Sequence, residues 1–446
     1  MSQTIQTNDN NIANPLILSE DEMAAHSDNL KKLSEKPLCE LNLDEHPNLL
    51  VFPPDFKTHG DDIGRERIFG IDGNKLLTGN IMGFVGYRNT QVRISSRFAN
   101  GDNDYFLHYM LRKVFAINLF DLRFDSDSES IFDFLLYLFP AFLKRAMRQG
   151  IYKEYQTRNY NNANIRGRID VSRHIRQNIP FNGCVAYTTR EYAIDNHLTQ
   201  LIRHTIEYIA KHSYGNGILQ NDDDVKTAVA QMVAATPTYN RNERQKIVYQ
   251  NLRPVCHPYF FEYRPLQRLC LQILRHEELK YGADDNQIYG ILFDGAWLWE
   301  EYLNTIFGKA FTHPHNKVDN VGKHIFRSPK RVLAQPDFFI DNKIVLDAKY
   351  KRHETIFDSK QREDRFQLIA YMHVFNALES GLIVPSIRTG IIEQGEIING
   401  GTMRLYGVKV QHEGDFKGYA EAMRKEEERI KDVINSEFAP KSVAIC

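Results

Sequence analysis

Two aspartates and a lysine near the C-terminal end of the chain have the types and spacing for metal-assisted hydrolysis. Asp337 follows Pro336, and Asp347 lies two residues before Lys349. Mg²⁺ prefers hard oxygen ligands and keeps several waters, so one or two carboxylates and a substrate phosphate suffice to hold it. The lysine would face the scissile phosphate or its attacking water. The set therefore predicts a Mg²⁺ site, in which Mn²⁺ should substitute and the Ala348 carbonyl adds a ligand.

A β-hairpin would bring these residues together. We expect strands over residues 332–340 and 343–348, joined by a turn at 341–342. Because side chains alternate along a strand, Asp347 and Lys349 should share one face. The second strand is mostly apolar, as a buried strand should be, yet Asp and Lys are rarely buried without partners. A surface hairpin with fortuitous charges is the alternative.

Two helices are expected to flank this hairpin. The downstream helix, over residues 362–377, carries Gln367 and Tyr371, whose i, i+4 spacing places both on one face. They should buttress the site or touch a DNA backbone. The upstream helix, over residues 295–310, carries Glu300, which the resemblance to a nuclease superfamily described below implies as an additional metal ligand. Its neighbour Glu301 could serve instead, and either glutamate could be an exposed charge of the helix.

The rest of the chain predicts a multidomain α/β protein. Its 446 residues are 42% hydrophobic, enough for about three domains. We expect a flexible tail (1–30), a β-rich plus helical N-terminal domain (31–147), a mostly helical middle domain (148–285), and a C-terminal domain (286–446) with a mixed sheet flanked by helices.

The composition of the chain indicates its cellular compartment and limits how it could bind DNA. The formal net charge is −1, so any DNA-binding surface must be a local patch. Five scattered cysteines without a CxxC pair argue against a zinc site and a disulfide framework. The polar N-terminus does not resemble a signal peptide, and no apolar stretch is long enough to span a membrane. We therefore expect a cytoplasmic protein.

One basic stretch, residues 144–176, contains nine Lys or Arg and only two acids. Its candidate binding residues are Arg166, Arg168, Arg173 and Arg176. Interleaved tyrosines suit stacking on nucleic acid bases. Contact with DNA, contact with a partner protein, and a merely solvated face all remain open for this stretch.

The hairpin motif resembles the signature of the PD-(D/E)XK nuclease superfamily. Pro336-Asp337 and Asp347-Ala-Lys349 supply the signature, while Gln367 and Tyr371 resemble the QxxxY element of several such nucleases. A closer resemblance is to the McrC family, the nuclease subunit of McrBC-type 5-methylcytosine restriction systems. It rests on Leu298-Trp-Glu-Glu-Tyr302, Gln335-Pro-Asp-Phe, Val345-Leu-Asp-Ala-Lys-Tyr350, Ile165-Arg-Gly-Arg-Ile-Asp-Val171 and Glu191-Tyr-Ala-Ile-Asp-Asn-His-Leu198.

The resemblance implies an endonuclease that cleaves double-stranded DNA and works with an AAA+ GTPase subunit, whose GTP hydrolysis it stimulates. This chain has no Walker A motif and should not hydrolyse nucleotide alone. Two departures are Trp299, where the family usually has Phe, and a long N-terminal region. Two alternatives stay open: a stand-alone restriction or repair nuclease, and a mainly non-catalytic assembly and GTPase-activating factor.

Overall fold

The computed structural model divides the chain into two compact units. The first unit combines residues 1–124 with residues 285–446, and the second comprises residues 125–284. The residues that the structure describes are 3–41, 46, 49–53, 62–99, 104–115, 128–212, 215–220, 222–280, 288–314, 321–326, 332–352, 355–398, 400–411 and 416–438.

A five-stranded sheet forms the N-terminal part of the first unit. In spatial order its strands are β1 (Gln3–Asn8), β7 (Thr90–Ser95), β6 (Ile81–Tyr87), β11 (Tyr289–Asp294) and β3 (Leu49–Phe52). β1 is parallel to β7 and β3 to β11, whereas β6 is antiparallel to both of its neighbours. A smaller sheet contains β2 (Leu16–Ile17), β5 (Lys75–Leu77) and β4 (Gly70–Asp72).

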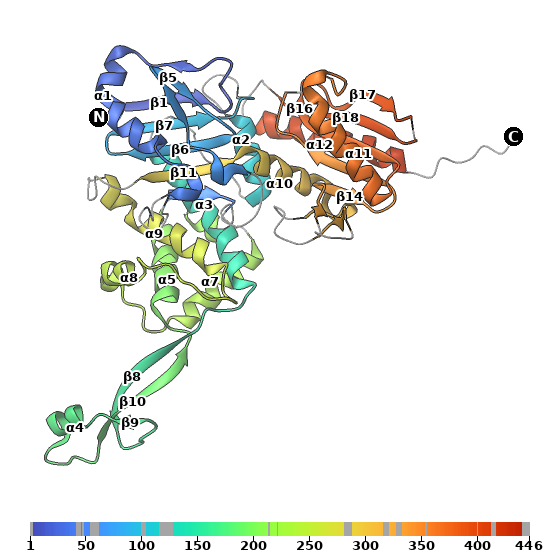
Figure 1. The fold of residues 1–446 in the computed structure, drawn as a ribbon. Coiled ribbons are helices and arrows are strands. Elements are labelled where there is room, and N and C mark those ends of the chain that lie inside the picture. The colour runs from blue at the N-terminus through green and yellow to red at the C-terminus, as the bar shows by residue number, and fades with distance from the viewer. Residues whose placement is uncertain are drawn as a thin grey trace. The chain divides into compact units, whose positions relative to one another are not determined.

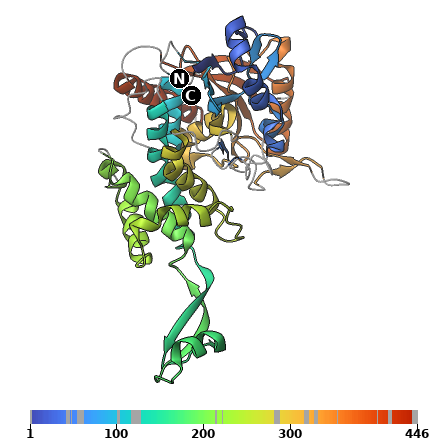
Figure 2. The ribbon, with the colours of Figure 1, turned by 90° about the vertical axis from the view of Figure 1, so that its left-hand side faces the viewer.

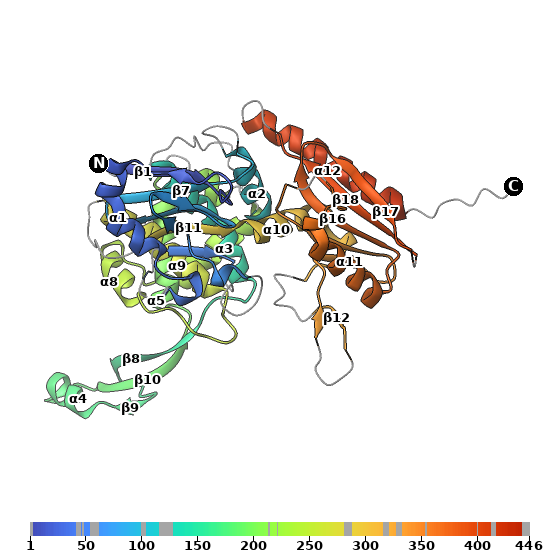
Figure 3. The ribbon, with the colours of Figure 1, turned by 45° about the horizontal axis from the view of Figure 1, so that its top comes forward.

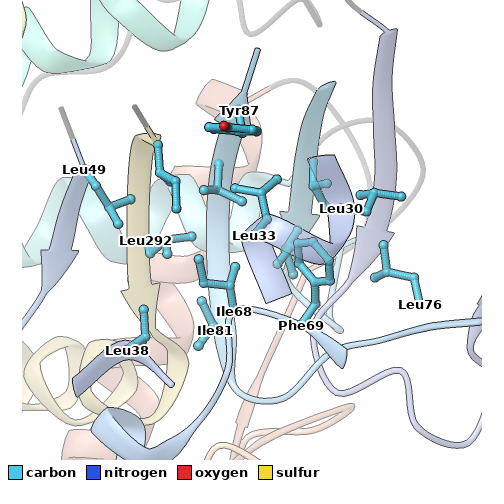
Figure 4. Close-up of a cluster of buried hydrophobic side chains, with 14 of the residues drawn as sticks. Leu30, Leu33, Leu38, Leu49, Ile68, Phe69, Leu76, Ile81, Tyr87 and Leu292 are labelled. Atoms are coloured by element: carbon cyan, nitrogen blue, oxygen red, sulfur yellow. The ribbon is translucent and has the colours of Figure 1, made fainter. Parts of the chain in front are cut away.

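Helix α1 (Glu20–Ser34) closes a hydrophobic core against this sheet. Its side chains Leu30 and Leu33 join a buried cluster with Ile81 and Leu292 from β6 and β11 (Figure 4). The helix begins at Ser19, which forms a capping box with Glu22. The predicted flexible tail over residues 1–30 is therefore wrong, because residues 3–8 pair with β7 and α1 buries apolar side chains.

A second five-stranded sheet forms the C-terminal part of the same unit. In spatial order its strands are β14 (Phe338–Ile340), β15 (Ile344–Ala348), β16 (Glu379–Ser386), β18 (Thr402–Lys409) and β17 (Gly390–Glu396). β15, β16 and β18 are parallel, whereas β14 and β17 run antiparallel at the edges. The small ladder of β12 (Lys323–His324) and β13 (Leu333–Ala334) precedes β14 (Figure 3).

Helices cover both faces of this mixed sheet. Phe307 of α10 (Gly295–Phe307) packs edge-to-face on Phe338, while Phe375 of α11 (Arg362–Phe375) packs on Phe339. Neighbouring residues of a strand point to opposite faces, so α10 and α11 lie on opposite sides. Helix α12 (Phe416–Phe438) packs against β17, β18 and α10, and α2 (Tyr105–Phe115) packs against α10 and α12.

The second unit is a helical bundle that carries a long β-hairpin. Its helices are α3 (Ser128–Met147), α5 (His197–Ile209), α6 (Gly215–Gln220), α7 (Asp223–Ala235), α8 (Arg244–Gln250) and α9 (Tyr263–Lys280). The hairpin pairs β8 (Glu154–Asn162) with β10 (Val185–Ala193), and β9 (Arg168–Ile169) and α4 (Val171–Asn178) lie between them in sequence. We call residues 154–193 the arm, which extends away from the helices of its unit (Figures 1 and 2).

The protein is thus a mixed α/β protein, as predicted, but the units divide it differently from the predicted domains. Helix α3 belongs with the middle region, and the first and last predicted domains join in one unit. The finer division into three domains, over residues 31–147, 148–285 and 286–446, stays a prediction. Among the described helices, none is both long enough and apolar enough to cross a membrane.

Candidate active site

The β14–β15 hairpin places the two predicted aspartates opposite one another. Phe338 pairs with Leu346, so Asp337 and Asp347 occupy the next positions of the two chains. The backbone N–H of Ala348 donates to Oδ2 of Asp337 at 2.7 Å. Both carboxylates are buried, with exposures of 6% for Asp337 and 2% for Asp347. A short turn therefore brings together two acidic side chains that the sequence separates by ten positions.

Lys349 lies beside these carboxylates. Its Nζ is 2.6 Å from Oδ2 of Asp347, which confirms that the two side chains share a face. Burial by itself would lower the pKa of Lys349, but the carboxylates of Asp347 and Asp337 outweigh it and raise the pKa above its ordinary value. The lysine is therefore held as an ammonium ion, with its side chain 22% exposed.

Helix α11 covers the face of the sheet on which this group lies. Asp347 shares a face of β15 with Val345, which packs in one cluster with Phe375 of α11. Asp364, in the first turn of α11, lies 4.0 Å from Nζ of Lys349 and 3.7 Å from Nζ of Lys351. Asp364 was not among the predicted site residues. Its spacing of three and seven residues from Gln367 and Tyr371 marks the same helix face and could have identified it.

Gln367 and Tyr371 support the segment that leads into the hairpin. The side-chain amide of Gln367 donates to the hydroxyl of Tyr371 at 3.0 Å, and this hydroxyl donates to the Gln335 carbonyl at 3.4 Å. Gln335 is two residues before Asp337. The contacts fit a buttressing role, while contact with a DNA backbone stays a prediction.

The two candidate glutamates are on α10, across the sheet from α11. Glu300 is buried, but it does not form a three-ligand group with Asp337 and Asp347: nowhere in the described part of the chain do three His, Cys, Asp or Glu side chains gather closely enough to hold a metal. Glu301 lies 3.7 Å from Nε2 of His313. A metal ligand on α10 therefore stays a prediction, without support from this arrangement.

The arrangement nevertheless fits a hard divalent cation. Each carboxylate offers about four lone-pair positions, so each can accept further contacts after one hydrogen bond or ion pair. Magnesium sites commonly use one or two protein carboxylates and complete the shell with water and phosphate. Two convergent aspartates, the Ala348 carbonyl and solvent would meet that requirement.

The four arginines of the basic stretch differ in their surroundings. Arg166, Arg168 and Arg176 are exposed on the arm. In contrast, Arg173 donates to the carbonyl oxygens of Tyr160 and Tyr187, at 3.0 and 2.6 Å, and so ties α4 to the hairpin. Arg173 thus has a structural role, and binding by the other three stays a prediction.

Comparisons with protein families and solved structures show which family the chain belongs to. The family model described as "McrBC 5-methylcytosine restriction system component" matches residues 76–385. No curated protein sequence matches significantly. A chain in the solved half-complex of Thermococcus gammatolerans McrB AAA+ hexamers with bound McrC is 15% identical, with a TM-score of 0.51. That match covers 97% of this chain and 100% of the other.

A second solved structure, the cryo-EM McrBC complex of the same organism, is also 15% identical, but its TM-score is 0.34 and it covers 69% of this chain and 88% of the other. The half-complex match thus supports a similar fold over nearly the whole chain. The family model spans well over half of the sequence, and its matched region contains the aspartates, the lysine and both supporting helix residues. The chain therefore belongs to the McrBC 5-methylcytosine restriction system component family.

Proposed function

We propose that this chain is the Mg²⁺-dependent endonuclease subunit of an McrBC-type restriction system, and that it hydrolyses phosphodiester bonds in double-stranded DNA. One observation carries the proposal: two buried carboxylates and a partly buried ammonium group converge on one face of a hairpin. Uncompensated burial of such charges is costly, so their convergence needs a reason. A site for a cation and a phosphate supplies that reason.

Each residue has a distinct part in the proposed reaction. Asp337 and Asp347 would hold the cation, which when bound polarises the phosphate and lowers the pKa of a bound water. Lys349 would place a positive charge beside the phosphate as negative charge develops. Asp364 would orient Lys349, and Gln367 with Tyr371 would hold the backbone that leads to Asp337.

The proposed partner is an AAA+ GTPase subunit. Support comes from the family of the chain and from the fold that it shares with a chain in the solved complex of McrB AAA+ hexamers with bound McrC. In this role the chain would stimulate GTP hydrolysis by the partner. The basic stretch of the arm is a candidate contact with that partner or with DNA.

Nuclease activity can be tested with the chain and its partner together. Asp347→Ala should abolish Mg²⁺-dependent cleavage of modified plasmid DNA but leave thermal unfolding and partner GTPase stimulation intact. Asp341→Ala, in the exposed turn of the same hairpin, is a matched control that should cleave normally. Cleavage retained by Asp347→Ala would eliminate the assignment of the site.

The same variants separate the two alternatives. A chain that acts mainly as an assembly and GTPase-activating factor would show GTPase stimulation but no metal-dependent cleavage in the wild type. A stand-alone nuclease would cleave without the partner. The intact pair of aspartates with Lys349 favours catalysis over the first alternative, since a non-catalytic site has no need of three converging charges.

A further inference from the structure

His313 lies on the outer side of the hairpin, next to the backbone of Asp337. Its segment forms an isolated antiparallel bridge to the edge strand β14, in which Thr312 and Phe339 exchange backbone hydrogen bonds of 2.9 and 3.0 Å. The imidazole ring stacks on Phe338, with centroids 4.8 Å apart and planes 17° from parallel. Its side chain is only 4% exposed. The ring is therefore fixed in place by its surroundings.

The two ring nitrogens of His313 lie near the Asp337 peptide and Glu301 of α10. Nδ1 is 2.7 Å from the Asp337 carbonyl oxygen, and Nε2 is 3.7 Å from Oε1 of Glu301. A carbonyl can only accept, so the proton is on Nδ1 and the histidine is the donor. Nε2 lies near the Glu301 carboxylate but beyond hydrogen-bond distance of it. The contact of this ring that bears on the hairpin is therefore the hydrogen bond from Nδ1 to the Asp337 peptide.

Asp337 is thus held at two points. Its carboxylate accepts from the Ala348 N–H, and its carbonyl accepts from His313. The residue directly precedes edge strand β14, whose outer side is paired locally through the Thr312–Phe339 bridge. Without the histidine, the Asp337 carbonyl would lose its hydrogen bond to the ring, and the bridge two residues further along would have to hold this side of the chain.

We propose that His313 is a positioning residue that fixes the Asp337 peptide and thereby directs the Asp337 carboxylate towards the cation. This inference rests on the proposed nuclease function. Residues that orient metal ligands typically change metal affinity or activity by about 10- to 100-fold when mutated. The same magnitude is expected here, without any direct contact between His313 and the cation.

Three substitutions distinguish positioning from simple packing. In His313→Asn the amide nitrogen falls near the position of Nδ1 and can still donate to the Asp337 carbonyl. In His313→Gln the amide reaches instead towards the Nε2 position and Glu301. His313→Ala removes both contacts. His373→Ala, on the exposed side of α11, is the matched control.

The measurements are Mn²⁺ binding to the full chain by electron paramagnetic resonance and the Mg²⁺ dependence of cleavage with the partner present. We expect His313→Ala and His313→Gln to weaken Mn²⁺ binding by about 10-fold or more, and His313→Asn to stay within about threefold of wild type. Thermal unfolding of each variant identifies any that fail to fold, and the Asn and Gln variants then carry the test.

Equal Mn²⁺ affinity in the folded Asn and Gln variants, or wild-type affinity in both, would overturn the positioning role. If Asp347→Ala abolishes cleavage while the His313 variants behave like wild type, only this inference fails. If Asp347→Ala still cleaves, the proposed function itself fails and takes this inference with it.

Discussion

The β14–β15 hairpin and the arm are both antiparallel hairpins with charged residues, but they use charge in opposite ways. The first hairpin buries Asp337 and Asp347 and brings Lys349 to 2.6 Å from a carboxylate. The arm leaves Arg166 and Arg168 exposed to solvent. Buried charges that converge constrain the chemistry of a site strongly, because each must be compensated. Exposed charges cost little, so their presence alone does not identify a ligand.

Among the changes that test this difference between the hairpins, removal of a buried carboxylate is expected to lower the cleavage rate most. Asp347→Ala should reduce the cleavage rate at saturating Mg²⁺ by at least about 10³-fold, since a bound cation contributes several kcal/mol of transition-state stabilisation. Single-turnover cleavage of a labelled duplex measures this loss. A reduction smaller than about tenfold would show that the hairpin charges are not the catalytic group.

Asp104 shows what a buried carboxylate does when backbone groups hold it. Burial raises the pKa of Asp104 to about 6, although the N–H groups of Ser96 and Leu107 donate to it at 2.5 and 3.1 Å. The folded state therefore binds this proton more tightly than the unfolded state, whose pKa is near 3.8.

The resulting stabilisation is fully present below the unfolded pKa of Asp104 and is lost as pH rises through about 6. We expect the Asp104 contribution to the free energy of unfolding to fall by about 2 kcal/mol between roughly pH 4 and 7. Chemical denaturation of wild type and Asp104→Asn across this range measures it. A pH dependence identical in both proteins would contradict the assignment.

The supporting hydrogen bonds on α11 should matter less than the carboxylates. Tyr371→Phe removes the hydroxyl that connects Gln367 to the Gln335 carbonyl. A net hydrogen bond contributes about 0.5–1.5 kcal/mol, so cleavage should slow by roughly two- to tenfold. A double-mutant cycle with Gln367→Ala should be strongly non-additive, because both residues act through one contact. Additive losses would argue for separate roles, such as independent DNA contacts.

Substitutions in the arm should change the rate of the chemical step least. Arg166→Ala combined with Arg168→Ala is expected to leave the Mg²⁺ dependence of cleavage unchanged. If these arginines bind phosphates, the slope of log affinity for DNA against log salt should fall by about one for each residue removed. If they contact the GTPase, its stimulation should fall while DNA affinity is kept. Lys153→Ala, at the exposed base of the arm, is the control.

Sequence patterns predicted the neighbourhood of the site well, because its elements are local. Helices predicted over 295–310 and 362–377 correspond to α10 and α11, and the turn between the two strands is where expected. The predicted first strand is divided into β13 and β14 on either side of Pro336, whose nitrogen cannot donate a hydrogen bond.

Local sequence patterns could not predict which strands pair over long sequence distances or which helix side chains contact which strands. Strand β1 is polar and lies at a sheet edge, so its pairing with β7 left no apolar pattern to detect. The Ser19–Glu22 capping box is a local signal for the start of α1, but the helix is polar enough that its apolar face is a weak pattern. Asp364 and His313 reach the site through tertiary contacts, which spacing alone does not encode.

Strand β11 has a practical consequence for the isolation of the region that contains the candidate active site. It lies between β6 and β3 in the N-terminal sheet and leads directly into α10, through the Asp294 cap. Tyr350, next to Lys349, also donates or accepts a 2.6 Å hydrogen bond with Ser96. A fragment that starts at residue 286 would keep the motif but expose one strand on both edges and leave that tyrosine unsupported. Removal of the second unit, residues 125–284, is the more promising route to a smaller protein that keeps the candidate site and both of its sheets.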